Sequence, residues 1–294
     1  MSIVVKNLSK KYKNSSKKSV DNVSINIPTG IFGLLGENGA GKTTFLKMLT
    51  TLLPSDSGEI KILNYNMCDH KQEIRNIIGY TPQEFDFFSN ITTFELMDYI
   101  AILKNIKNES ARKEQIYDLL NKFNLGDKVN TKIKHLSGGM KQRLGIAQSL
   151  LGNPKVIILD EPTVGLDPNE RLRFRNIINE LSQTKTVIIS THIISDVAMM
   201  CESVAIMKNG KVIYSGDINT LLDNTRGKVF IDTINNACSV DDSKYGQVIS
   251  VLRKNDIIEI RFISKDKPKI NTCIEIDPTL EDAYFYMMFC SEGE

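Results

Sequence analysis

The sequence predicts an α/β fold over about its first 220 residues and a small α+β region after them. Short runs rich in β-branched residues alternate with longer helical patterns in the first part, and these runs are apolar throughout. A glycine-rich segment joins one of the runs directly to a helix. Strands that are apolar on both faces are typical of a parallel sheet covered by helices on each side, so we expect that arrangement here.

Composition and charge limit the classes to which the chain can belong. It has 294 residues, 41% of them hydrophobic and 24% charged, which is typical of a globular protein with one large domain or two ordinary ones. No apolar run approaches the roughly 18–20 residues that cross a bilayer, and lysines stand too close to Met1 for a secretion signal. Five scattered cysteines favour a cytoplasmic location without a zinc site or disulfide framework. A net charge of +2 argues against nucleic acid as a partner.

The elements of the first part follow from periodicity and turn residues. We expect strands at Ile3–Val5, Val23–Ile27, Ile31–Leu35, Val156–Leu159 and Thr186–Ile189. We expect helices at Lys42–Leu53, Thr93–Lys104, Glu109–Phe123, Met140–Leu151 and Arg171–Leu181. The amphipathic helices in the middle of the chain predict a helical subdomain over about residues 85–152.

The pattern changes after about Leu222. Strands are expected at Lys228–Ile231, Gln247–Leu252, Ile257–Ile263 and Cys273–Ile276, with a final helix at Leu280–Phe289. Residues 223–294 are therefore predicted to form a small accessory domain after a larger domain of residues 1–222. This region carries no chemical motif, which favours a structural role or the docking of a partner.

A phosphate-binding loop (P-loop) is predicted at residues 36–43, whose sequence GENGAGKT fits Gly-x-x-x-x-Gly-Lys-[Ser/Thr] between a strand and a helix. Its glycines let backbone N–H groups approach phosphate oxygens without a Cβ in the way, next to a helix N-terminus that favours anions. Lys42 is expected to reach the β- and γ-phosphates of a nucleotide, and the Thr43 hydroxyl to bind Mg²⁺. The nucleotide-binding residues expected here are Gly36, Asn38, Gly39, Ala40, Gly41, Lys42, Thr43 and Thr44.

Two adjacent carboxylates, Asp160 and Glu161, come directly after the apolar run Val156–Leu159. A P-loop needs an acidic partner at the end of a neighbouring strand. Asp160 is expected to hold Mg²⁺ through water, because Mg²⁺ keeps much of its hydration shell. Glu161 is expected to orient or deprotonate the water that attacks the γ-phosphate.

A third motif, Leu136-Ser137-Gly138-Gly139-Met140, opens a helix. A serine and free backbone amides at a helix N-terminus form a second anion site, so we expect the γ-phosphate to be held from two opposite directions. With this motif the sequence resembles the nucleotide-binding subunit of ABC transporters over about residues 2–220. The motifs that carry the resemblance, in the family's order, are Tyr12, the P-loop, Gln83, Leu136–Met140, Asp160-Glu161, Gly165-Leu166-Asp167-Pro168 and His192.

The resemblance implies an ABC-type ATPase domain of the P-loop NTPase class that binds and hydrolyses ATP. It implies that Tyr12 stacks on adenine, that Gln83 senses Mg²⁺ and the γ-phosphate, and that His192 hydrogen-bonds the γ-phosphate. Each has an ordinary alternative, since Tyr12 could be a surface aromatic, Gln83 a loop residue and His192 a strand-end histidine. The implied catalytic residues are Glu161, His192 and Gln83, and the implied Mg²⁺ ligands are Thr43, Gln83 and Asp160.

The resemblance also implies that a complete site needs two chains. Ser137, Gly138 and Gly139 match the signature loop that contacts ATP held by the opposite subunit, and Asp167 matches the residue that links the two sites. Met140 stands where many members have glutamine. Because one chain has one P-loop and one signature loop, we predict a homodimer, or a pair of nucleotide-binding subunits, around two ATP molecules. The two subunits would close when ATP binds and separate when it is hydrolysed, and this change would drive motion.

This motion must be transmitted to a partner protein. The resemblance implies that the partner is a separate integral membrane permease, which holds the subunit at the membrane. Residues 85–88, Phe-Asp-Phe-Phe, with Ile91 form a candidate docking surface, although these phenylalanines could equally belong to the core. Met140 and the tail Pro278–Tyr284 resemble exporters of drugs, antimicrobial peptides or lipids. A soluble ABC ATPase that acts as an ATP-driven regulatory switch without transport is the alternative.

Overall fold

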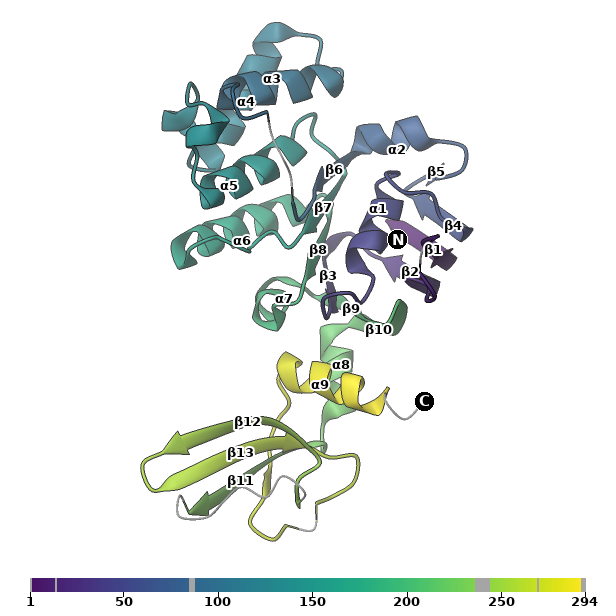
Figure 1. The fold of residues 1–294 in the computed structure, drawn as a ribbon, viewed down its shortest axis with the longest axis vertical. Helices are drawn as coiled ribbons and strands as arrows, with labels where there is room; N and C mark the ends of the chain where they lie inside the picture. The colour runs from purple at the N-terminus through teal and green to yellow at the C-terminus, as the bar shows by residue number, and fades with distance from the viewer. Residues whose placement is uncertain (1, 14, 85–87, 236–243, 269, 292–294) are drawn as a thin grey trace.

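The computed structural model describes residues 2–13, 15–84, 88–235, 244–268 and 270–291. A six-stranded sheet lies at the centre of the larger part of the molecule (Figure 1). Neighbouring strands in it are parallel except at one edge, where β10 is antiparallel to β9. In spatial order its strands are β10 (Lys211–Asp217), β9 (Ser203–Lys208), β3 (Gly30–Gly36), β8 (Thr186–Thr191), β7 (Val156–Asp160) and β6 (Ile78–Thr81).

Both faces of this sheet are covered, as the continuously apolar strands predicted. On one face Phe32 and Leu34 of β3 pack with Phe45 and with the second sheet described below. On the other face Ile31 and Leu35 belong to a core shared with the helices that follow β6, β7 and β8. The helices that cover the two faces are α1 (Lys42–Leu49), α5 (Gly138–Ser149), α6 (Pro168–Ser182) and α7 (Ile194–Met200).

The first two strands, expected at Ile3–Val5 and Val23–Ile27, are present but lie in a separate antiparallel sheet rather than in the parallel one. Side chains along β2 alternate between buried and exposed, the pattern of a strand with one solvated face, which suits antiparallel pairing. The second sheet has the order β2 (Val20–Ile27), β1 (Ile3–Lys10), β4 (Ser57–Ile62) and β5 (Tyr65–Asn66), and α2 (Lys71–Ile77) leads from it to β6.

Helix α1 ends at Leu49, four residues before the expected end at Leu53. The chain turns at Thr51, which has φ +63°, and the backbone N–H groups of Leu52 and Leu53 both donate to the Lys47 carbonyl oxygen at 3.0 Å. These bonds satisfy a carbonyl that the helix leaves free at its end. Periodicity alone does not reveal such a turn.

Helices gather at one end of the molecule, at the top of Figure 1. Their starts are fixed by side-chain caps: Thr92 and Glu95 form a capping box, and Asn108 accepts from the Ala111 N–H at 3.0 Å. The elements here are α3 (Thr93–Leu103), α4 (Glu109–Lys122), the 3₁₀ turns η1 (Gly126–Lys128) and η2 (Ile133–His135), and the start of α5.

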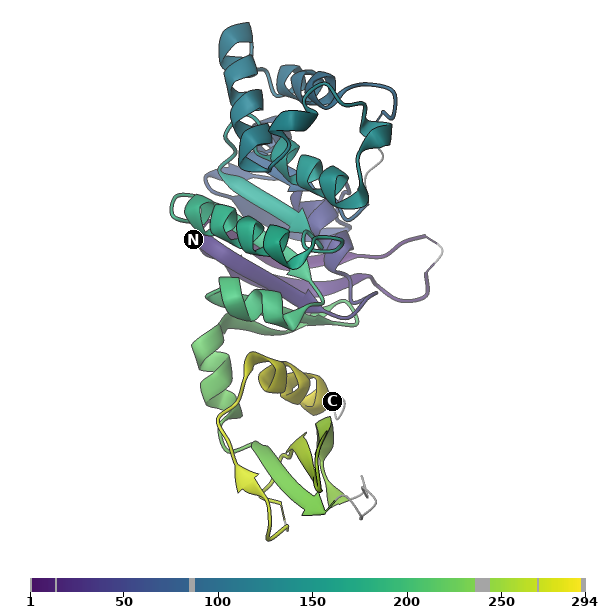
Figure 2. The same ribbon diagram turned by 90° about the vertical axis from the view of Figure 1, so that its left-hand side faces the viewer.

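The residues after β10 form a helix, a small antiparallel sheet and a last helix at the opposite end from α3 and α4 (Figures 1 and 2). The sheet has its own small core, which includes Phe230, Tyr245 and Phe262. These elements are α8 (Ile218–Thr225), then in spatial order β12 (Gln247–Lys254), β13 (Ile257–Ile263), β11 (Val229–Asn235) and β14 (Ile274–Glu275), and α9 (Leu280–Cys290).

Helix α9 packs against the larger part of the molecule. Leu280, Ala283 and Met288 belong to the same hydrophobic core as the central sheet and α7. Lys208, at the end of β9, donates to the Met288 carbonyl oxygen at 2.9 Å. The division into residues 1–222 and 223–294 stays a prediction. In the described ranges, every helix is too short or too polar to cross a membrane.

Candidate nucleotide-binding site

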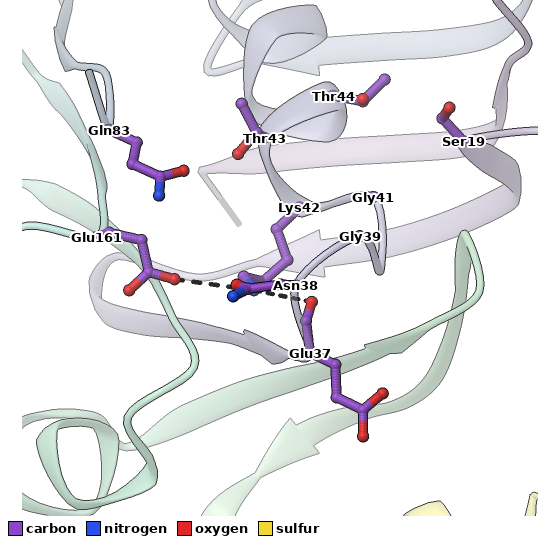
Figure 3. A pocket seen from close by; sticks show the side chains of 10 residues that line it. All are labelled: Ser19, Glu37, Asn38, Gly39, Gly41, Lys42, Thr43, Thr44, Gln83 and Glu161. Atoms are coloured by element: carbon purple, nitrogen blue, oxygen red, sulfur yellow. Dashed lines mark hydrogen bonds and ion pairs between the residues drawn. The ribbon is translucent and has the colours of Figure 1, made fainter. Parts of the chain in front are cut away.

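The predicted P-loop connects β3 to α1 and forms one wall of a cavity of about 430 Å³. Figure 3 shows Gln83 and Glu161 on the opposite wall, with their side chains directed toward Lys42 and Thr43. The lining residues are Ser19, Glu37, Asn38, Gly39, Gly41, Lys42, Thr43, Thr44, Gln83 and Glu161. The structure therefore brings together residues that lie far apart in the sequence. The predicted residues Gly36 and Ala40 belong to the loop but do not line the cavity.

Two glycines of the loop have conformations that other residues would not adopt without strain. Gly41 has φ +104°, and a Cβ there would lie 2.1 Å from the Ser19 carbonyl oxygen. Gly39 has φ +85°, with open space where its Cβ would be. Gly41 lets the loop pack closely against Ser19, just before β2, and Gly39 leaves room for phosphate oxygens at the open side of the loop.

Lys42 is buried at the start of α1, with its ammonium group folded onto the loop. Its Nζ donates to the carbonyl oxygens of Gly36 at 2.6 Å and Glu37 at 3.2 Å, and lies 3.8 Å from Glu161 Oε1. Burial lowers the pKa of Lys42, although the carboxylates of Glu161 and Asp160 oppose that shift. A phosphate group in the cavity would replace these carbonyl contacts with a charged one.

Asp160 and Thr43 form an all-oxygen pair that fits Mg²⁺. Thr43 Oγ1 donates to Asp160 Oδ2 at 2.8 Å, and Asp160 Oδ1 is buried with no hydrogen-bond partner among the described residues. Burial raises the pKa of Asp160, because the carboxylate has lost its water. Mg²⁺ is commonly held by one or two carboxylates together with substrate phosphates, so a single carboxylate beside a P-loop suffices.

Glu161 is held in an unusual conformation at the end of β7. Its φ is +51°, a left-handed value that is uncommon for a residue with a side chain. Its backbone N–H donates to the Ser190 carbonyl oxygen at 2.8 Å, and Thr191 Oγ1 donates to Oε2 at 3.2 Å. His192 Nδ1 lies 3.0 Å from Oε1, within hydrogen-bond distance. The buried carboxylate is thus oriented by the end of β8 and faces Lys42.

Tyr12 and Gln83 lie at the margins of the cavity. Tyr12 is exposed and outside the cavity lining, but its hydroxyl is 3.3 Å from Thr44 Oγ1. Gln83 is exposed and directed into the cavity. His192 is exposed and reaches the site through Glu161 rather than lining the cavity.

The signature loop lies outside this cavity. Ser137 and Gly138 are exposed, and neither they nor Gly139 line the nucleotide cavity of the same chain. Ser137 Oγ accepts from the Met140 N–H at 3.3 Å and so caps α5, while Asp167 caps α6 by accepting from the Glu170 N–H at 2.9 Å. The two loops approach each other, since a Cβ on Gly139 would lie 3.2 Å from the Gly165 carbonyl oxygen.

Sequence reasoning missed several residues that shape the site, among them Ser19, Thr191 and Gln142. Ser19 lines the cavity through a loop contact that no motif predicts. Thr191 was passed over although it stands next to His192. Gln142 donates through Nε2 to the Pro162 carbonyl oxygen at 3.2 Å, a contact between distant segments that no local pattern signals. Of the predicted docking segment, residues 85–87 lie outside the described residues, whereas Phe88 is 67% exposed and Ile91 packs against the core.

Comparisons with known proteins agree with this geometry. The family model described as "ABC transporter" matches residues 20–164. The uncharacterized ABC transporter ATP-binding protein YxlF of Bacillus subtilis is 34% identical over 276 residues, 92% of this chain and 90% of that protein. The probable multidrug ABC transporter ATP-binding protein YbhF of Escherichia coli is 34% identical over 232 residues, 79% of this chain but 40% of that longer protein.

Solved structures similar to this chain are also ATP-binding cassettes of ABC transporters. The dimeric structure of an ATP-binding cassette in a post-hydrolysis state, bound to ADP and Pi, is similar with a TM-score of 0.66 and 28% identity. The match covers 73% of this chain and 98% of that one. The part of the chain that it leaves uncovered is close in size to the predicted accessory domain.

Proposed function

Because this chain belongs to the ABC transporter ATP-binding proteins, which bind ATP with Mg²⁺ and hydrolyse it, we propose that it pairs with a second cassette to power export through a separate membrane permease. In this proposal the chain is a cytoplasmic subunit held at the membrane by the permease. Each of two ATP molecules would lie between the P-loop of one subunit and the signature loop of the other. The pair is a homodimer or two related nucleotide-binding subunits.

In the proposed mechanism the triphosphate occupies the P-loop cavity. The loop N–H groups and Lys42 bind its β- and γ-phosphates, and Thr43, Asp160 and Gln83 hold Mg²⁺. Bound Mg²⁺ neutralises negative charge on the phosphate oxygens. Glu161 accepts a proton from the water whose oxygen attacks the γ-phosphorus, and the bond to the ADP oxygen breaks.

Three further residues complete the proposed assignment. His192, 3.0 Å from Glu161, orients that carboxylate and contacts the γ-phosphate. Tyr12 stacks on adenine beside Thr44, and Asp167 links the two nucleotide sites across the dimer. The position of Tyr12 at the cavity margin, 3.3 Å from Thr44, supports this adenine contact.

The observation that carries the dimer is the separation of the two anion-binding loops within one chain. The cavity holds the P-loop, Gln83 and Glu161, but Ser137–Gly139 lie outside it with an exposed serine. A single chain therefore leaves its signature loop unused and its γ-phosphate site open on one side. A second copy can supply the missing loop in a closed two-fold arrangement.

A bulky charged residue in the signature loop should separate ATP binding from turnover. We expect Ser137→Arg to bind ATP as tightly as wild type, because that loop is absent from the chain's own cavity. Turnover should fall on the order of 10²-fold, the cost of losing one donor that stabilises developing charge. ATPase assays and light scattering with ATP would measure this, with the exposed Ser55→Arg as the control. A Ser137→Arg variant that loses ATP affinity, or that hydrolyses normally, contradicts the shared site.

A groove with exposed leucines supports permease docking. The groove, of about 420 Å³, lies between α1, α2 and α3 and is lined by Leu52, Tyr80 and Leu103 among others. Leu52 is 63% exposed and Leu103 66% exposed, so two large apolar side chains in this groove are open to a partner. The names of relatives support drug or lipid export: a probable multidrug transporter protein and a phospholipid-transporting ATPase.

Capture from membranes should distinguish transport from the regulatory alternative. We expect the tagged chain to co-purify with an integral membrane protein, and Leu103→Asp to lose that partner while its own ATPase rate stays unchanged. Met199→Asp, at an apolar position on α7 that is 61% exposed against 66% for Leu103, is the matched control and should retain the partner. Recovery of no membrane protein with the wild-type chain would favour a soluble regulatory ATPase.

A further inference from the structure

The short segment Glu161–Thr163 links the proposed general base, Glu161, to the loop that contains Asp167. Glu161 has a left-handed backbone at its start, and all three residues are buried. A left-handed conformation at a residue other than glycine costs of order 1–3 kcal/mol and persists only when the surroundings fix it. The contacts that fix this segment therefore decide where the Glu161 carboxylate lies.

A short, buried side-chain hydrogen bond to this segment comes from α7. Thr163 Oγ1 donates to Asp196 Oδ2 at 2.6 Å, and each of the two residues is only 1% exposed. Arg175 on α6 donates through Nη2 to Asp196 Oδ1 at 3.3 Å. Its Nε is buried and has no hydrogen-bond partner among the described residues, so the pair is not bidentate through Nε. Asp196 thus joins α7, α6 and the Glu161 segment through one buried carboxylate.

The opposite side of the segment is held by α5. Gln142 Nε2 lies 3.2 Å from the Pro162 carbonyl oxygen and 3.4 Å from that of Glu161. These bonds are longer than the one to Asp196 and are made by a half-buried amide. The shorter, fully buried bond to Asp196 is therefore expected to contribute more to holding the segment than the Gln142 bonds do, beside the backbone bond from the Glu161 N–H to the Ser190 carbonyl oxygen.

We propose that Asp196 and Thr163 are positioning residues for ATP hydrolysis, whose buried hydrogen bond keeps the Glu161 carboxylate opposite Lys42 and beside His192. Neither residue lines the nucleotide cavity, so the effect passes through the backbone of residues 161–163. Asp196 follows His192 by four residues. The Thr163–Asp196 hydrogen bond therefore also fixes the distance between residues 161–163 and the segment that carries His192. This inference rests on the proposed role of Glu161.

Replacing the Thr163 hydroxyl tests the bond with little change of shape. We expect Thr163→Val to lower kcat about tenfold or more while KM for ATP changes less than about twofold, because misplacement by about 1 Å can cost up to 10²-fold. Thr163→Ser keeps the donor and should restore most of the wild-type kcat. Thr225→Val removes another fully buried hydroxyl bond, in α8, and should leave kcat unchanged.

Rates are to be compared per ATP-binding subunit, so that a loss of folded protein does not count as a loss of turnover. If Thr163 acts through Glu161, adding Thr163→Val to Glu161→Gln should cause no further loss of the residual rate. A wild-type kcat in Thr163→Val, or a failure of Thr163→Ser to restore it, overturns this inference alone. A wild-type kcat in Glu161→Gln overturns instead the proposed function on which it rests.

Discussion

Glu161→Gln is expected to hydrolyse ATP about 10²–10⁴-fold more slowly than wild type, the usual range for a lost general base. The amide cannot accept a proton from the attacking water, yet it keeps the size of the side chain. It can also keep a bond from the Thr191 hydroxyl, which lies 3.2 Å from Oε2. ATP binding should persist, because Lys42 and the P-loop are untouched. Steady-state phosphate release under saturating ATP measures the effect.

The same variant should accumulate as the ATP-bound dimer, because hydrolysis normally separates the two subunits and would now be slow. Light scattering with and without ATP would detect this as an increase in mass. Glu202→Gln, an exposed glutamate next to β9, is the control and should behave as wild type in both measurements. Unchanged turnover in Glu161→Gln would show that another group receives the proton.

Lys42→Ala is expected to abolish nucleotide binding at concentrations that saturate the wild-type protein. Lys42 is the cation buried against the P-loop, and it lies 3.8 Å from Glu161. Removing one member of a buried charged contact costs roughly 2–5 kcal/mol, which weakens ATP binding by about 30-fold to 5,000-fold. Equilibrium binding of a fluorescent ATP analogue measures the affinity directly.

The matched control for this experiment is Lys47→Ala in the same helix. Lys47 is exposed on α1, so the variant removes a lysine without changing the cavity. It should bind ATP with wild-type affinity. Tight binding of ATP by Lys42→Ala would contradict the P-loop assignment.

The sequence alone was sufficient for the buried central strands and the family. β3, β7 and β8 are apolar on both faces, and their side chains are buried almost throughout, so their composition reflects their environment. The antiparallel sheet was harder to predict. β1 pairs with β4 through residues about 50 positions apart, with an irregular register between Lys6 and Ser9, and such pairing leaves no local pattern. Several short elements, among them α2, β6 and α7, have too few residues to show a period.

The candidate site was predictable where chemistry imposes a spacing. The P-loop spacing and the adjacent Asp160 and Glu161 identified the two sides of the cavity. A P-loop requires an acidic partner at the end of a neighbouring strand, so the P-loop gave these two carboxylates their expected roles. The contacts that orient Glu161 could not be predicted in this way. Thr191 and Asp196 reach the segment because β8 pairs with β7 and α7 follows β8, and the sequence order of strands does not reveal that neighbourhood.

The packing of α9 has a consequence for how the polypeptide acquires its structure during translation. Leu280, Ala283 and Met288 fill a core that α7 and the central strands also share, although some 70 residues of chain intervene between β9 and this helix. In a ribosome-bound chain that has emerged only as far as β10, the apolar side chains that α9 covers are therefore exposed to neighbouring nascent chains. Shortened products that lack α9 should be prone to aggregation and to capture by chaperones, even when their ATP-binding motifs are intact.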